Sequence, residues 1–140
     1  MTHFASWERD LLDELQVGRL ATIAADGRPH LAPVCYALAG DSIVIPVDEK
    51  PKRSLKLERL RNIERHPRVS LLFDRYAGDW TQLAWVRVDG HASVLPRGDE
   101  RPGALRALRA RYEQYAAMRL EERPLIVVTP ERARSWRWES

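Results

Sequence analysis

A short basic segment of this 140-residue chain carries the residue types that best suit an anion-binding site. It lies within Val47-Asp48-Glu49-Lys50-Pro51-Lys52-Arg53-Ser54, which joins the end of a predicted strand to the start of a predicted helix. The free backbone N–H groups of a helix N-terminus favour an anion, and Ser54 is a suitable N-cap residue. Lys50, Lys52 and Arg53 would add positive charge and directed donors. This basic segment (residues 50–54) therefore predicts a site for a phosphorylated ligand.

The positive charge of the chain is concentrated around this segment. Between residues 50 and 68, eight Lys and Arg residues stand against two Glu residues, while the whole chain has a formal net charge of +3. A local surplus favours one anion site over general binding of nucleic acid, and the sequence contains no recognised nucleic-acid-binding module. The absence of Walker and G-x-G-x-x-G motifs disfavours a P-loop nucleotide and a Rossmann dinucleotide. We expect a small phosphorylated ligand and no nucleic-acid partner.

Other kinds of chemistry have weaker support in the sequence. Cys35 is the only cysteine, which excludes an internal disulfide, and its place in a predicted strand is typical of a buried structural thiol. The four histidines show no metal-binding spacing, so no metal site is predicted. His30, Tyr36 and solvent are all candidate proton donors, and no residue stands out as catalytic.

Five tryptophans in 140 residues are a high content. Trp7 suits a core position, whereas Trp80 and Trp85 lie near the start of a long predicted strand. Trp136 and Trp138 alternate along the last predicted strand and are expected to share one face. Aromatic residues in such places are typical of packing, of a subunit interface, or of a stacking wall for a planar ring.

Three helices and seven strands are expected to position these residues. Hydrophobic periodicity and breaking residues predict helices over residues 4–16, 54–66 and 102–120. They predict strands over residues 20–25, 31–38, 42–47, 68–73, 83–95, 125–129 and 133–138, the last two separated by a bend at Pro130. Gly90 is expected at a bulge. Because hairpins join most strands, the pattern predicts a mainly β (α+β) fold, a small antiparallel barrel with helices at its ends, in one domain of residues 1–140.

The sequence predicts no contact with a membrane. No apolar run approaches the roughly 18–20 residues that a spanning helix needs. The first residues show neither the basic nor the apolar region of a secretory signal, so we expect a cytoplasmic protein.

Four stretches of the chain resemble the pyridoxamine 5'-phosphate oxidase-like (FMN-binding) split β-barrels. They are G-R-L-A-T (18–22), D-G-R-P-H-L-A-P-V (26–34), H-P-R-V-S-L-L-F (66–73) and W-V-R-V-D-G (85–90). The resemblance covers about residues 15–95 in the family's order. It implies an antiparallel split β-barrel with peripheral helices that forms a homodimer. It also places the basic segment where the family binds the phosphate of its flavin.

Within this superfamily the chain is similar to the actinobacterial split barrels that use coenzyme F420, a deazaflavin that carries a hydride. The short length, the D-G-R-P-H-x-A-P-V hairpin and the D-W-x-x-L-x-W-V-R-V-D-G segment (79–90) support this subgroup. The FMN-using oxidases carry a glutamine where this chain has Trp85, and an Arg-Lys pair where it has Lys-Pro-Lys-Arg. Their C-terminal substrate-binding motif is also missing.

Membership of the F420 subgroup implies two cofactor clefts at the subunit interface of a homodimer. The ring would lie against the second and third predicted strands, the phosphate on the basic segment, and a tryptophan of the partner subunit would complete the wall. The implied residues are Pro33, Val34, Ile45, Pro46 and Val47 for the ring, Lys50, Lys52, Arg53 and Ser54 for the phosphate, and Trp80 or Trp85 for the wall. The implied activity is hydride transfer to or from a small organic substrate. The alternatives are an FMN-binding flavoprotein, a haem-binding split barrel and a non-catalytic F420 carrier.

Overall fold

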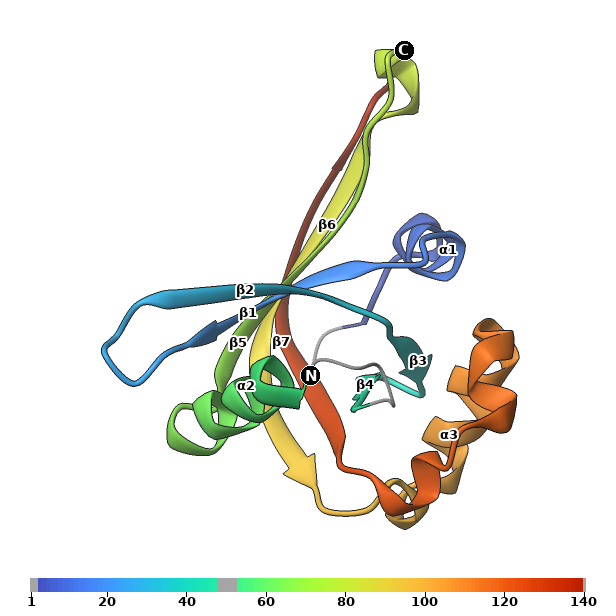
Figure 1. Cartoon of the computed structure of the whole chain (residues 1–140). Coiled ribbons are helices and arrows are strands. Elements are labelled where there is room, and N and C mark those ends of the chain that lie inside the picture. Colours follow the sequence, from blue (N-terminus) through green and yellow to red (C-terminus); the bar gives the residue numbers. More distant parts are fainter. Residues whose placement is uncertain (1–2, 48–52, 140) are drawn as a thin grey trace.

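Seven strands form one antiparallel sheet within residues 3–47 and 53–139, the part of the chain that the computed structural model describes, without the side chains of residues 53–57. The order across the sheet is β2-β1-β5-β6-β7-β4-β3. The strands are β1 (Gly18–Ile23), β2 (Pro29–Val34), β3 (Ala37–Ala39), β4 (Ser42–Pro46), β5 (Arg68–Arg75), β6 (Ala84–Leu95) and β7 (Leu125–Arg137). The sheet curls, and β6 and β7 run side by side along the length of the molecule to the end where the C-terminus lies (Figure 1). This curled antiparallel sheet with helices around it confirms the expected split-barrel α+β fold.

Three α-helices lie around the sheet in the described part of the chain: α1 (Ser6–Glu14), α2 (Arg53–Arg65) and α3 (Pro102–Arg111). Both α1 and α2 end close to their predicted positions. Helix α2 stops just before His66-Pro67, as expected from the restriction that a proline places on the preceding residue. None of these helices is long and apolar enough to cross a membrane.

The β1–β2 hairpin forms at the predicted Asp26-Gly27 turn. Gly27 has a φ of 86°, in the left-handed region that glycine reaches without a steric cost. The backbone N–H of Ala24 donates to the carbonyl of Arg28 at 2.8 Å and closes the turn. The hairpin sets a register in which Ala21 lies opposite Leu31.

The predicted strand over residues 31–38 is wrong, because β2 and β3 are separate strands with Cys35 and Tyr36 between them. The backbone of Tyr36 bonds to side chains instead of a neighbouring strand: its N–H donates to the Tyr112 hydroxyl at 3.1 Å, and its carbonyl accepts from Arg111 Nε at 2.9 Å. Cys35 therefore lies in a connection, half-buried, and not inside a strand.

The two predicted strands over residues 125–129 and 133–138 form one continuous strand, β7. Pro130 is accommodated because the register between β6 and β7 shifts between Asp89 and Gly90, so that Glu131 is the extra residue. A Cβ atom on Gly90 would overlap the carbonyl oxygen of Thr129, which explains why glycine stands at the bulge. The bulge predicted at Gly90 is confirmed.

Helix α3 is shorter than predicted and ends at Arg111, followed by the 3-10 turns η3 (Glu113–Ala117) and η4 (Leu120–Glu122). Its end coincides with a group of contacts that we call the Arg111 cluster (Tyr36, Arg111 and Tyr112). The Arg111 guanidinium donates to the carbonyls of Asp13 and Leu15 at the end of α1, and lies 4.8 Å from the ring centroid of Tyr36. The Tyr112 hydroxyl lies 2.9 Å from the Gln16 carbonyl. These bonds hold Tyr112 in an extended conformation, where the helix cannot continue.

The helices leave part of one face of the sheet uncovered. Helices α1 and α2 pack on the inner face, where the main core gathers residues such as Leu12, Leu20, Phe73 and Ile126. Helix α3 packs on the opposite side of β3, β4 and the start of β7. Strand β4 is therefore buried on both faces, whereas the burial of β1, β5 and β6 alternates along each strand. The alternation marks an open surface on these strands.

Candidate functional site

The uncovered surface, which we call the outer face, is built from alternate residues of β2, β1, β5, β6 and the second half of β7. The register aligns these residues in rows that cross the sheet. The rows are Leu31-Ala21-Ser70-Asp89-Arg132, Pro33-Arg19-Leu72-Arg87-Arg134 and Asp74-Trp85-Trp136. Apolar side chains lie open on it, with exposed fractions of 71% for Leu31, 37% for Leu72 and 43% for Trp136. Exposed apolar residues gathered on one surface are typical of a binding or interaction site.

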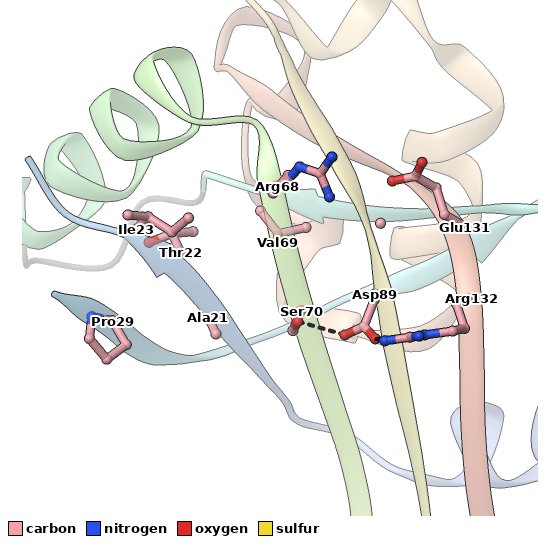
Figure 2. Close-up of a pocket in the computed structure, with 11 residues that line it drawn as sticks. Ala21, Thr22, Ile23, Pro29, Arg68, Val69, Ser70, Asp89, Glu131 and Arg132 are labelled. Carbon is pink, nitrogen blue, oxygen red and sulfur yellow. Dashed lines mark hydrogen bonds and ion pairs between the residues drawn. The ribbon is translucent and has the colours of Figure 1, made fainter. Parts of the chain in front are cut away.

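Two adjoining hollows lie on the outer face and share Ala21 and Ser70. The bulge hollow, of about 610 Å³, extends from the β1–β2 hairpin to the β6–β7 bulge (Figure 2). The tryptophan hollow, of about 450 Å³, is lined by Trp85, Leu31, Leu72 and their neighbours. The two hollows differ in chemistry, because the lining of the first is more polar than that of the second, which is almost entirely apolar.

A hydroxyl, a carboxylate and a guanidinium of the bulge hollow form a connected row across β5, β6 and β7, as Figure 2 shows. The Ser70 hydroxyl donates to Asp89 Oδ1 at 2.7 Å, and Arg132 Nη2 donates to Asp89 Oδ2 at 3.0 Å. The hydrogen bond from Ser70 is the main cause that lowers the pKa of Asp89. Asp89 is therefore an ionised, fully bonded carboxylate, which suits positioning and does not suit a general acid.

The tryptophan hollow has an aromatic wall and an apolar floor. Trp85 is half-buried there and lies opposite Asp74 on β5 and Trp136 on β7. Asp74 is held by Arg19, whose Nη1 lies 3.0 Å from Asp74 Oδ1. An indole beside leucines can pack against a planar ring. That a tryptophan forms a stacking wall stays a prediction, and of the two candidates Trp85 is the one that lines this hollow.

The residues expected to hold the ring are divided between the outer face and the core. Pro33 is exposed on the outer face, opposite Arg19. Val34, Ile45 and Val47 belong to the main core, and Pro46 is buried as well. In the single chain their side chains do not line either hollow.

The expected phosphate site is only partly within the described residues. Lys50 and Lys52 lie outside them. Arg53 and Ser54 occupy the first two positions of α2. Ser54 is thus a residue of the helix itself, and the expectation that it is the N-cap is wrong because the helix begins one residue earlier than predicted.

The remaining candidate residues lie away from the hollows. Trp80 lies in the 3-10 turn η1 (Trp80–Gln82) with an exposed fraction of 66%. The Tyr36 hydroxyl is fully buried and donates to the Leu12 carbonyl at 2.6 Å, and burial raises its pKa. Tyr36 is therefore a structural residue and not a proton donor to substrate. His30 lies on the face that α2 covers, with Nε2 3.9 Å from Glu58.

Several residues of the outer face were not identified from the sequence: Arg19, Leu31, Ser70, Leu72, Arg87, Asp89, Arg132 and Arg134. The alternation in Val86-Arg87-Val88-Asp89 indicates that Arg87 and Asp89 share the solvent side of a strand. Which residues of other strands join them depends on the register, which the sequence does not reveal.

A family model described as pyridoxamine 5'-phosphate oxidase matches residues 8–137. The chain belongs to this family. The resemblance noted in the sequence is confirmed at this level, and the split barrel is the fold that the family shares with the solved structures below.

The chain is similar in structure to several solved proteins of low sequence identity. A conserved hypothetical protein from Mycobacterium tuberculosis superposes with a TM-score of 0.76 at 23% identity, over 98% of this chain and 86% of that one. A heme binding protein from Mycobacterium smegmatis superposes with a TM-score of 0.71 at 24% identity, over 97% of this chain but 55% of that one, so this chain spans about half its length. A FAD-binding protein from Mesorhizobium loti superposes with a TM-score of 0.65 at 22% identity, over 94% and 92%. At these identities the likeness shows the fold alone.

Proposed function

We propose that the protein is a coenzyme F420-dependent oxidoreductase that transfers a hydride to or from a small organic substrate, acting in the cytoplasm as a homodimer. The observation that carries this proposal is the position of Trp85. It stands where the FMN-using oxidases that the sequence resembles carry a glutamine, and it lines a hollow whose floor is apolar. An indole in place of an amide exchanges a hydrogen-bonding side chain for a stacking one.

The residues of the tryptophan hollow fit a planar, anionic cofactor. Trp85 would stack on the ring, Leu31 and Leu72 would exclude water, and Arg19 and Arg87 supply positive charge at the rim. Lys50, Lys52, Arg53 and Ser54 would hold the phosphate. When bound, the deazaflavin supplies the hydride, and the protein orients the reactants.

A proton must accompany the hydride, and the lining residues restrict its source. Guanidinium groups such as those of Arg19 and Arg87 do not act as acids in proteins, Asp74 is paired with Arg19, and the Ser70 hydroxyl donates to Asp89. Tyr76 lines the same hollow and is largely exposed. Among the described lining residues, its hydroxyl is the group we propose as the proton donor, with solvent as the competing source.

FMN and haem are the two alternatives to F420 as the cofactor. The FAD-binding structure of the same fold supports a flavin, so FMN is the second candidate. The heme binding structure supports haem. Haem iron needs an axial ligand, and the described residues that line the two hollows include no His, Cys or Met, with Tyr76 as the one lining group of a suitable type. This donor set favours a deazaflavin or flavin over haem.

We propose that the homodimer forms through the outer face. Leu31, Leu72 and Trp136 present apolar surface there that a second copy would remove from water. Pairing through this face would also close each tryptophan hollow, so that both subunits contribute to one cofactor site.

The test is a titration of the purified protein with F420, FMN and haem, followed by tryptophan fluorescence and then by assays with a panel of oxidised small molecules. We expect F420 to bind most tightly, and Trp85→Gln to weaken it about tenfold through loss of stacking. Trp138→Phe, which changes an exposed tryptophan away from the tryptophan hollow, is the control. Tighter binding of FMN or haem would replace the F420 assignment, and F420 binding without turnover would identify a carrier.

A further inference from the structure

Two arginines face each other on the outer face, and neither forms an ion pair with an acidic residue in the described part of the chain, although the charge of Arg87 also acts on Asp89, whose carboxylate is bonded to Ser70 and Arg132. Arg87 of β6 lies directly opposite Arg134 of β7. Both side chains are exposed, and neither makes a hydrogen bond or ion pair with any residue in the described part of the chain. Like charges directly opposite each other destabilise a sheet. We call these two residues the arginine pair.

In the neighbouring row, the arginine lies opposite a carboxylate and not opposite a second arginine. Two residues further along the same two strands, Asp89 lies opposite Arg132, and their ion pair measures 3.0 Å. Arg19, in the same row as the arginine pair, is bound to Asp74. Arg19 and Arg132 thus each have a carboxylate partner, whereas Arg87 and Arg134 have none within ion-pair distance in the described part of the chain.

The row on the other side of the arginine pair is aromatic. Trp85 lies opposite Trp136, on the same two strands and on the same face. Opposed side chains have Cβ atoms about 5 Å apart, and successive rows on one face are about 7 Å apart. The Cβ atoms of the two arginines therefore lie about 7 Å from those of the two tryptophans, and all four side chains leave the sheet on the same face, where one fused-ring molecule with an attached anionic group can contact both rows.

We propose that Arg87 and Arg134 form an anion subsite that binds a carboxylate or phosphate of a planar ligand stacked on Trp85 and Trp136. Guanidinium groups bind these oxyanions through paired, charge-assisted hydrogen bonds. The subsite shares no residue with the basic segment. The identity of the cofactor rests on the proposed function, but the anion subsite itself does not.

The experiment uses a simple planar anion, 2-naphthoate, and its uncharged analogue 2-naphthamide. Binding is followed through the indole ¹H–¹⁵N resonances of the five tryptophans, assigned by single Trp→Phe variants. We expect 2-naphthoate to shift the resonances of Trp85 and Trp136, with an affinity that falls as salt is added. Arg87→Gln combined with Arg134→Gln should weaken binding about tenfold or more.

A matched control removes the same number of charges elsewhere. Arg101 and Arg106 lie at the start of α3 and within it, away from the outer face, and the side chain of neither has a hydrogen bond or ion pair in the described part of the chain. Arg101→Gln combined with Arg106→Gln should leave 2-naphthoate binding unchanged. The proposal is overturned if both double variants bind 2-naphthoate alike, if 2-naphthamide binds as tightly as 2-naphthoate, or if Trp85 and Trp136 do not respond.

The same variants distinguish the two sources of the anion. If the Arg87→Gln, Arg134→Gln protein also binds F420 about tenfold more weakly, the subsite holds an anionic group of the cofactor. If F420 binding is unchanged while 2-naphthoate binding falls, the subsite holds an acidic substrate. A protein that binds 2-naphthoate as described but none of F420, FMN and haem would retain the anion subsite and lose the proposed function.

Discussion

The two faces of the sheet differ in how far their side chains are buried and in how far their polar groups are paired. On the inner face, large residues such as Phe73, Leu20 and Ile126 are almost fully buried, and the buried Tyr36 hydroxyl is hydrogen-bonded. On the outer face, Leu31, Leu72 and Trp136 are exposed, and the arginine pair forms no ion pair within the residues that the structure describes. Strand β6 takes part in both faces, so alternate residues of one strand meet opposite conditions.

The inner face accounts for the stability of the fold, whereas the outer face is suited to binding. Burial and hydrogen bonding on the inner face lower the free energy of the folded single chain. The outer face contributes little of that, because its apolar groups stay in water and its charges are incompletely paired. Such a surface stabilises the protein only when a ligand or a second copy covers it.

The largest effect on stability is expected at the Arg111 cluster, which joins α1, α3 and the β2–β3 connection. Arg111 donates to the backbone carbonyls of Asp13, Leu15 and Tyr36. Arg111→Ala removes these three bonds, leaves the Leu15 and Tyr36 carbonyls only the Tyr36 and Tyr112 hydroxyls as donors, and should lower the free energy of unfolding by about 3 kcal/mol. Urea denaturation followed by circular dichroism measures the change.

Arg111→Lys is the matched control for this prediction. Lysine keeps the charge but lacks the planar fork that reaches three carbonyls at once. It should therefore recover only part of the lost stability. A loss below about 0.5 kcal/mol for Arg111→Ala, the range of ordinary surface changes, would show that the cluster does not stabilise the inner side.

Much of the fold is predictable from local sequence. The Asp26-Gly27 turn, the end of α2 before Pro67 and the bulge at Gly90 each depend on residues close in the chain. The errors occur where distant residues decide. Tyr36 leaves the sheet because of partners 75 and 76 positions away, and Pro130 stays within a strand because Gly90 gives it room.

The candidate site is less predictable than the fold for the same reason. The sequence identifies Trp85 as a possible wall, and the structure places it in a hollow on the outer face. It does not reveal that Val34 and Ile45 point into the core of the single chain, or that Arg87 faces Arg134. Both facts depend on strand register, which residues far apart in the chain determine.

A smaller effect on stability, with a large effect on association, is expected at Leu31 of the outer face. Leu31→Glu changes a side chain that is already 71% exposed, so the free energy of unfolding of the single chain should change by no more than about 0.5 kcal/mol. A charge at this place should prevent two copies from pairing. Sedimentation equilibrium of wild type and variant measures the association.

Val17→Glu provides the control, because Val17 is an exposed apolar residue that lies before β1 and lines neither hollow. It should leave a dimer intact. If Leu31→Glu also leaves the dimer intact, the subunits pair elsewhere. If Leu31→Glu unfolds the chain, the outer face contributes to the stability of the single chain, contrary to what we expect.

The smallest effect is expected at an ion pair that, unlike the arginine pair, is complete. Arg109 of α3 donates from Nη1 to Glu121 Oε2 at 2.7 Å, and this bond is the main cause that lowers the pKa of Glu121 from 4.5 to about 2. Because the folded-state pKa lies below the unfolded one, the pair stabilises the fold fully above about pH 4.5. That stabilisation is lost as the pH falls towards about 2.

Glu121→Gln should therefore be less stable than wild type at pH 7, and the difference should disappear between about pH 4.5 and pH 2. Urea denaturation at pH 7, 4 and 3 follows it. The effect is small because the Glu121 side chain is 46% exposed and water screens the pair. Glu113→Gln, at an exposed carboxylate in η3 with no ion pair in the described part of the chain, should show no such dependence. Equal pH profiles for the two variants would show that the ion pair between Arg109 and Glu121 does not stabilise the fold. In that case an arginine with an ion pair would not differ in stability from one without, and the unpaired state of Arg87 and Arg134 would carry no special meaning.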